Sequence, residues 1–171
     1  MNGSMTRRRF AELSSAAAGF AVASIQSPAP APQDDQLKSE FLLHLVIETG
    51  PAHAIGSAGL TRVVVPVAGG TFEGPKLKGT IVGPSGDWIV GRPDGSSLLD
   101  VRLLLLTDDG ENVYMSWRGI NSTPAGGAQY ARIVPAFESG ASKYLWLNDI
   151  VSVGVYRPTP GKVAYRVYQI L

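Results

Sequence analysis

Short apolar runs alternate with Gly, Pro, Asn and Asp along the chain from Leu37 onward. Within these runs, the alternation of apolar and polar residues is typical of strands in an antiparallel sheet. The pattern predicts about nine strands, at Glu40–Glu48, Thr61–Val67, Lys76–Val82, Trp88–Arg92, Leu98–Thr107, Asn112–Arg118, Gln129–Phe137, Tyr144–Tyr156 and Lys162–Ile170.

Turn residues separate these runs. Both Pro93-Asp94-Gly95 and Asp108-Asp109-Gly110 combine an Asp that bonds the local backbone with a Gly that tolerates positive φ, which predicts hairpins. Because no long helical pattern intervenes, consecutive hairpins favour an antiparallel meander, either closed into a barrel or packed as a sandwich. Of these we favour the barrel: one all-β domain over residues 37–171, poor in helix, with about eight or nine strands and room for a small ligand.

The N-terminal residues have the order of an export signal. Consecutive arginines in Thr6-Arg7-Arg8-Arg9 precede an apolar stretch from Phe10 to Ile25, as in a twin-arginine signal peptide. The stretch is too short and too rich in Ala and Gly for a stable membrane span. We expect residues 1–25 to be this signal, residues 26–36 to be a Pro- and Ala-rich tether, and the mature protein to be periplasmic or secreted. The alternative is a basic amphipathic helix that stays attached.

Composition narrows the chemistry. The 171 residues include no Cys, which removes disulfides and thiolate sites, and only two His, so we expect neither a metal nor a cofactor. The formal net charge of +1 depends on the signal, since without it 12 of the 15 basic and 13 of the 14 acidic side chains remain. This near-neutral body lacks the basic face that nucleic-acid binding needs.

Two short segments place charge beside aromatic or apolar neighbours. In Gly86-Asp87-Trp88, the aromatic neighbour can raise the carboxyl pKa toward a range useful for acid or base catalysis. The alternative is a turn Asp beside a core Trp. Further on, Asp100 and Arg102 share one strand face with two leucines. If that face points inward, Arg102 can hold an anionic or phenolate oxygen and Asp100 can orient it. On the surface they form only a salt bridge or cross-strand pair.

Tyr114, Ser116 and Arg118 share one face of their predicted strand, and Met115 and Trp117 share the other. The first face is suited to binding a carbonyl or an oxyanion, although solvent exposure explains it as simply. The second face is suited to packing.

Other candidate contacts lie in less specific surroundings. Tyr144, Trp146 and Asn148 alternate, which predicts an aromatic row that lines a pocket or belongs to the core. Glu73 follows a Gly-rich stretch that lacks the ending of a phosphate loop and predicts a bulge or tight turn instead. His44 lies between leucines, as a packed residue or a substrate contact.

Several motifs occur together in the order and spacing of one family. They are Gly69–Gly79, Gly86-Asp87-Trp88, Asp94-Gly95, Asp100-Val101-Arg102, Thr107–Gly110 and Tyr144–Asn148. With them, the chain from Leu37 to its end resembles the DUF3237 family of small, uncharacterised bacterial and fungal proteins. The resemblance implies a single β-barrel, calycin-like or allene-oxide-cyclase-like, with a pocket near the Asp-Trp, Asp-x-Arg and Trp-Leu-Asn elements. It implies no particular activity.

The leading hypothesis is an exported enzyme that performs cofactor-independent proton transfer, as a cyclase, isomerase or lyase, on a small apolar or aromatic substrate. Asp87 would act as acid or base, and Arg102 and Tyr114 would stabilise an oxyanion. The substrate would contact Trp88, Asp100, Trp146, Asn148, Glu73 and His44. The alternatives are a non-catalytic periplasmic binding protein for a hydrophobic or aromatic small molecule and a structural barrel with a filled interior. We expect no nucleic-acid partner, and no membrane partner once the signal is cleaved. A homo-oligomer is compatible with the sequence.

Overall fold

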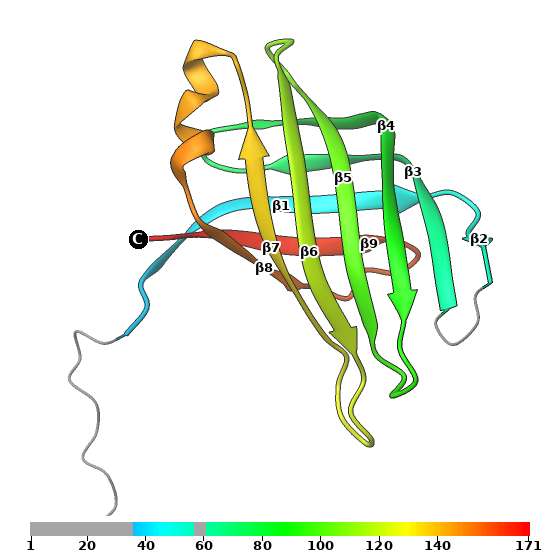
Figure 1. The fold of residues 1–171 in the computed structure, drawn as a ribbon. Helices are drawn as coiled ribbons and strands as arrows, with labels where there is room; N and C mark the ends of the chain where they lie inside the picture. The colour runs from blue at the N-terminus through cyan, green and yellow to red at the C-terminus, as the bar shows by residue number, and fades with distance from the viewer. Residues whose placement is uncertain (1–35, 57–60) are drawn as a thin grey trace, which may run out of the picture. The chain divides into compact units, whose positions relative to one another are not determined.

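The computed structural model describes residues 36–56 and 61–171, so the predicted signal and most of the predicted tether lie outside the described residues. Nine strands follow one another in the described part of the chain (Figure 1). They are β1 (Ser39–Thr49), β2 (His53–Ala54), β3 (Thr61–Glu73), β4 (Lys78–Gly91), β5 (Ser97–Thr107), β6 (Asn112–Ser122), β7 (Tyr130–Glu138), β8 (Ser152–Tyr156) and β9 (Val163–Ile170). A 3-10 helix, η2 (Ser142–Asp149), lies between β7 and β8.

Eight of the strands close into an antiparallel β-barrel. From β3 to β9, each strand hydrogen-bonds to the next one in the sequence, and β1 closes the ring by pairing with both β9 and β3. The short strand β2 pairs with the first half of β3. Closure gives every wall strand a partner on both sides, so the barrel leaves no long free edge. The prediction of a single antiparallel barrel is confirmed.

Two predicted strands, Lys76–Val82 and Trp88–Arg92, form the single long strand β4. The Gly-Pro-Ser-Gly sequence between them predicts a break, but the strand continues through an irregularity between Val82 and Gly86. Ser85 bridges this irregularity, because its hydroxyl donates to the Val82 carbonyl at 2.6 Å and accepts the Leu104 N–H at 2.9 Å. A side chain thus replaces the missing backbone bonds of the ladder.

The predicted strand Tyr144–Tyr156 is wrong over its first half, which forms η2. In a 3-10 helix, residues three apart lie on one face, and Tyr144 and Leu147 are accordingly buried at 2% and 0% exposure. The Tyr144 hydroxyl also donates to Asp109 in the β5–β6 turn at 2.7 Å. The expectation that Tyr144, Trp146 and Asn148 project together therefore does not hold.

The Gly-rich stretch before Glu73 serves a bulge, as predicted. The pairing of β3 with β4 shifts register between Pro66 and Thr71, and here β3 bends so that its second half also pairs with β1. Gly70 has a φ of 144°, and a Cβ atom there would lie 2.2 Å from the Val46 carbonyl oxygen. Only glycine allows the two strands to approach so closely.

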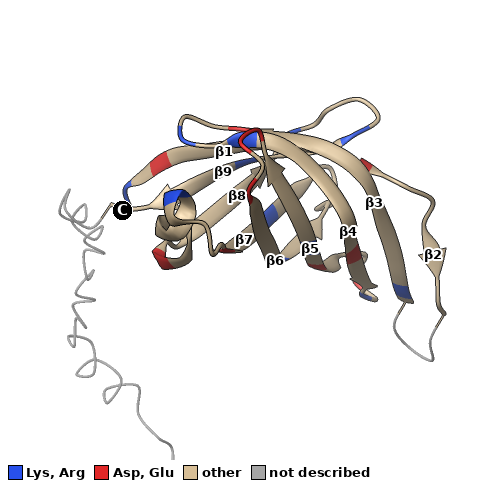
Figure 2. Ribbon diagram, turned by 90° about the horizontal axis from the view of Figure 1, so that it is seen from above, with Lys and Arg blue, Asp and Glu red and all other residues tan. Residues whose placement is uncertain are grey.

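The end of the barrel next to η2 is filled by apolar side chains. Among the most buried are Leu43, Leu45, Phe72, Leu103, Leu105, Val113, Met115 and Leu147. Figure 1 shows η2 at the same end as the β5–β6 hairpin. Within the described residues, no helix is long and apolar enough to cross a membrane. Seen from above (Figure 2), charged positions are scattered over strands and turns, and ion pairs such as Lys78–Asp108 join opposite charges.

Candidate functional site

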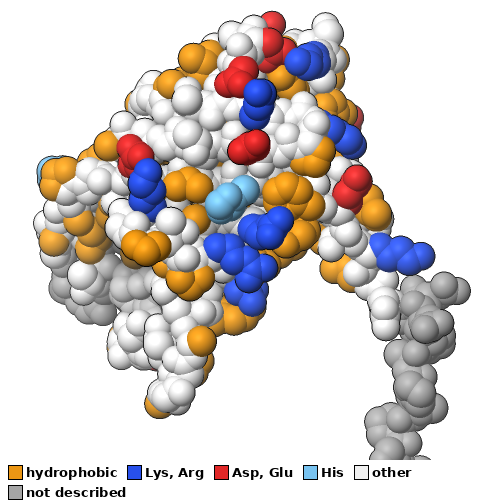
Figure 3. All heavy atoms as spheres, turned by 180° about the vertical axis from the view of Figure 1, so that it is seen from behind, with side chains coloured by type: hydrophobic (Ala, Val, Ile, Leu, Met, Phe, Trp, Pro, Cys, Tyr) orange, Lys and Arg blue, Asp and Glu red, His pale blue; other side chains and the backbone are white. Residues whose placement is uncertain are grey.

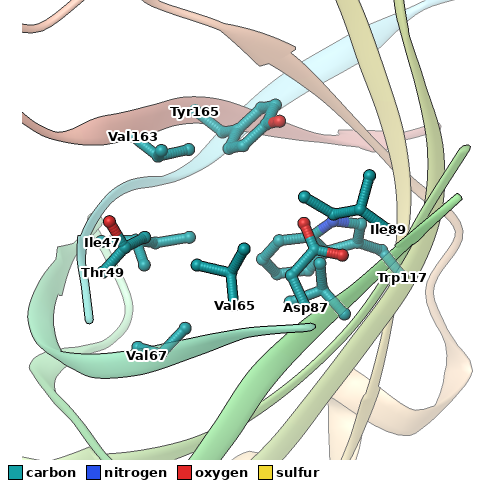
Figure 4. Close-up of a pocket in the computed structure, with 10 residues that line it drawn as sticks. Ile47, Thr49, Val65, Val67, Asp87, Ile89, Trp117, Val163 and Tyr165 are labelled. Carbon is teal, nitrogen blue, oxygen red and sulfur yellow. The ribbon is translucent and has the colours of Figure 1, made fainter. Parts of the chain in front are cut away.

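A cavity of about 210 Å³ lies inside the barrel at the end opposite η2. Its wall comes from six strands and consists of Ile47, Thr49, Val65, Val67, Asp87, Ile89, Val101, Trp117, Val163 and Tyr165 (Figure 4). Ile47, Val101, Trp117 and Tyr165 are buried, whereas Asp87 and the remaining wall residues are partly or fully exposed. A buried cavity of about 150 Å³ is enough to bind benzene. The size therefore suits a small ring compound.

Asp87 points into this cavity because of its position in the sheet. It pairs with Val65 of β3 on one side and Val101 of β5 on the other, and Val101 pairs with Trp117 of β6. Side chains directly opposite one another in adjacent strands face the same side of a sheet. The side chains of Val65, Asp87, Val101 and Trp117 therefore form one inward-facing row, and Asp87 supplies its single carboxyl group.

The apolar surroundings change the acidity of Asp87. Burial raises the pKa of Asp87 from its ordinary 3.8 to about 6. The backbone N–H of Asp100 donates to Asp87 Oδ1 at 3.3 Å and lowers this pKa, while the negative charge of Asp100 raises it by a smaller amount. The carboxyl group can therefore hold or release a proton near neutral pH, as acid and base catalysis require.

Two aromatic side chains share the cavity with Asp87. The rings of Trp117 and Tyr165 lie 6.0 Å apart between centroids at 60°, and Tyr156 packs edge-on against Tyr165 at 5.8 Å. Burial raises the pKa of Tyr165, and the charge of Asp87 raises it further. The Trp117 indole Nε1–H is buried without a hydrogen-bond partner among the described residues.

The structure does not bring Arg102 and Tyr114 to Asp87. Along β5 the inward row is Leu99, Val101, Leu103 and Leu105, so Asp100 and Arg102 lie on the outer wall. There Arg102 forms an ion pair with Asp100 at 3.3 Å, and its guanidinium lies 5.3 Å from the ring centre of Trp88. The prediction that Asp87, Arg102 and Tyr114 converge on one pocket is therefore wrong. Both faces of β5 are rich in leucine, so the sequence does not show which one is buried, and the face that carries Asp100 and Arg102 points outward.

Tyr114 lies in a groove on the outer wall, together with Asp100, Arg102, Ser116 and Arg118. Its strand has the two faces predicted, with Val113, Met115 and Trp117 buried and the polar residues outside.

The other predicted contacts also lie away from the cavity. Trp146 is half-buried beside Lys76, whose Nζ is 5.2 Å from the ring centre. The Asn148 side chain accepts the Ser139 N–H at 2.8 Å and donates to the Ser139 carbonyl at 3.0 Å, so it holds the end of η2 to the residue that follows β7.

His44 and Glu73 face each other across β1 and β3, and both are exposed. The surface seen from behind carries basic, acidic and apolar side chains side by side (Figure 3). Among residues 36–56 and 61–171, no three His, Asp or Glu side chains gather as a metal site.

Most of the cavity wall is not among the residues that the sequence pattern predicts for the site. For Trp117 the signal exists, because the alternation that predicts a packing face on its strand also turns its side chain inward. Tyr165 carries no such signal, since both it and its neighbour Ala164 are buried. It reaches the cavity only because β9 lies against β1 after closure.

Fold and site together define a small β-barrel with an apolar interior pocket and a single carboxyl group in its wall. Residues 37–170 match the family described as protein of unknown function (DUF3237), and the chain belongs to this family.

Two relatives are similar in sequence to this chain over most of its length. A UPF0311 protein of Rhodopseudomonas palustris is 26% identical over 149 residues, covering 79% of this chain and 97% of the relative. A hydroalkoxylation enzyme of Penicillium herquei is 29% identical over 138 residues, covering 80% of this chain and 83% of that enzyme.

Solved structures agree with the barrel. A β-barrel-like protein from Acinetobacter baumannii is 30% identical, with a TM-score of 0.74 over 85% of this chain and all of that one. An enzyme from Penicillium herquei, 21% identical, has a TM-score of 0.68 over 83% of this chain and 100% of its own, and shares the fold.

Proposed function

We propose that this protein is an enzyme that moves a proton on a small, largely apolar or aromatic substrate, with Asp87 as the acid or base. One observation carries the proposal: a single carboxyl group, with a pKa raised to about 6, lies in the wall of an otherwise mostly apolar cavity. A carboxyl group in such surroundings is available in both protonation states near neutral pH.

The hydroalkoxylation relative supports this class of reaction. A hydroalkoxylation adds the O–H of an alcohol across a C=C bond, so one proton leaves oxygen and one joins carbon. A single carboxyl group can perform both transfers, giving its proton to the carbon and taking the proton of the attacking hydroxyl. Cyclisations and isomerisations that proceed by proton transfer can likewise use a single carboxyl group. We assign Arg102 and Tyr114 no part in the proton transfer, since both lie on the outer wall.

The test is product analysis with a panel of unsaturated phenols and enones, using the wild type and Asp87→Asn. We expect Asp87→Asn to retain ligand binding and to lower turnover by about 100-fold or more, the usual contribution of acid or base catalysis. Asp100→Asn is the matched control, because this carboxyl lies outside the cavity while its backbone N–H still bonds Asp87. Unchanged turnover in Asp87→Asn overturns the assignment, and ligands that bind but are recovered unchanged indicate a carrier instead.

We also propose that the protein is exported by the twin-arginine route, with Arg7, Arg8 and Arg9 as part of its signal peptide. Replacing Arg7 and Arg8 by Lys should retain the protein in the cytoplasm. An unprocessed N-terminus in the cytosolic fraction of the wild type, unaffected by the double replacement, would overturn this proposal.

A further inference from the structure

A buried hydrogen-bond donor in the cavity wall has no partner. The Trp117 indole Nε1–H bonds to no other group in the described residues, although this side chain is only 3% exposed. An unpaired buried donor destabilises a fold, and roughly 90% or more of buried polar groups avoid this condition. Because Trp117 belongs to the cavity wall, a bound molecule is well placed to supply the missing acceptor.

Tyr165 supplies a second donor in the same cavity wall. Its ring packs against Trp117, and Figure 4 shows its hydroxyl on the side of the cavity where Trp117 and Asp87 lie. Since burial raises the pKa of Tyr165, its hydroxyl keeps its proton at neutral pH and above. An indole N–H can only donate. The cavity wall therefore contains two side chains that can donate a hydrogen bond to a ligand.

The rest of the wall limits what that atom can be. None of the described residues that line the cavity is Lys, Arg or His, so an anionic group would meet Asp87 without a compensating cation. A carbonyl oxygen has two lone pairs and no hydrogen, and it matches two donors without charge. Much of the remaining wall is aliphatic, with Ile47, Val65, Val67 and Val163.

We propose that Trp117 and Tyr165 bind the carbonyl oxygen of an uncharged, largely apolar ketone in this cavity. The inference rests on the proposed function, because it concerns the same site and names its substrate class. The two donors polarise the carbonyl group, while Asp87 lies within the same wall to exchange a proton with the carbon skeleton.

Three ring compounds of similar size test the donor pair by calorimetric titration of the full chain. 1-Indanone and indane differ in the carbonyl group, and indane-1-carboxylate adds a negative charge. We expect the wild type to bind 1-indanone about tenfold more tightly than indane, as one or two net hydrogen bonds allow, and to bind the carboxylate most weakly. Tyr165→Phe keeps the ring and should lose most of the preference for 1-indanone. Tyr156→Phe is the matched control and should keep it, because Tyr156 packs on Tyr165 but does not line the cavity.

Infrared spectroscopy reports on the hydrogen bonds themselves. The carbonyl stretch of bound, isotope-labelled 1-indanone should move to lower wavenumber in the wild type and move back in Tyr165→Phe and in Trp117→Phe. Equal binding of 1-indanone and indane by the wild type, no binding of either, or an unmoved carbonyl band overturns the inference. The Asp87→Asn variant separates the two proposals: turnover at the wild-type rate refutes the proposed function, whereas the preference for 1-indanone tests only the donor pair.

Discussion

Asp87 carries a stability cost that its removal should reveal. In the folded protein, burial raises the pKa of Asp87 from 3.8 to about 6, so the fold binds this proton more tightly than the unfolded chain does. Below about pH 3.8 the group is protonated in both states and costs nothing. Between pH 3.8 and 6 the unfolded chain ionises first, and above pH 6 the full cost is present. Asp87→Asn removes the charge and should therefore stabilise the protein at high pH only.

The size of the effect follows from the difference in pKa. A difference of about two corresponds to about 3 kcal/mol. Water at the partly open mouth of the cavity screens the charge, which reduces the expected gain to about 1–2 kcal/mol. A gain in stability at the expense of activity is common where an active site holds an unfavourable group.

Urea unfolding of the wild type and Asp87→Asn at pH 8 and pH 4 measures this directly. The variant should be more stable at pH 8, and the difference should shrink toward pH 4. Asp94→Asn is the control of opposite sign, because hydrogen bonds from Ser96 lower the pKa of Asp94 and stabilise its ionised form in the fold. Its loss of stability should be present at pH 8, should largely persist at pH 4, and should disappear only as the pH falls through the lowered folded-state pKa. A difference between wild type and Asp87→Asn that is absent at pH 8, or independent of pH, would refute the reasoning.

Two further predictions concern the outer wall and the bulge. Arg102→Ala and Tyr114→Phe should leave 1-indanone affinity within about twofold and the free energy of unfolding within about 1 kcal/mol, since both residues lie outside the cavity. A large loss of affinity in either variant, measured by titration, would place that side chain at the site after all. Gly70→Ala should destabilise the protein by at least about 2 kcal/mol, because its Cβ meets the Val46 carbonyl. Gly140→Ala, with no atom within 4 Å of its Cβ, should leave the thermal unfolding midpoint unchanged, and an equally unchanged midpoint for Gly70→Ala would contradict the bulge geometry.

The local sequence pattern was sufficient to predict most of the strands. Period-two alternation and the Asp-Gly turns predicted the strands and the all-β class, because strand formation and hairpin turns depend on residues close in sequence. Residues 144–149 do not follow this prediction, because their run of four apolar or aromatic residues also fits the three-residue repeat that buries Tyr144 and Leu147 in η2.

The sequence by itself determined the alternating faces of each strand and singled out Asp87 as a candidate acid or base. It did not decide which face turns inward, because along β5 the leucines occupy both faces and closure of the barrel selects Val101 over Arg102. Only the tertiary structure brought Tyr165 beside Trp117 and Asp87, since the pairing of β9 with β1 joins segments far apart in the chain. A pocket made from six different strands depends on such long-range pairing, which no local pattern encodes.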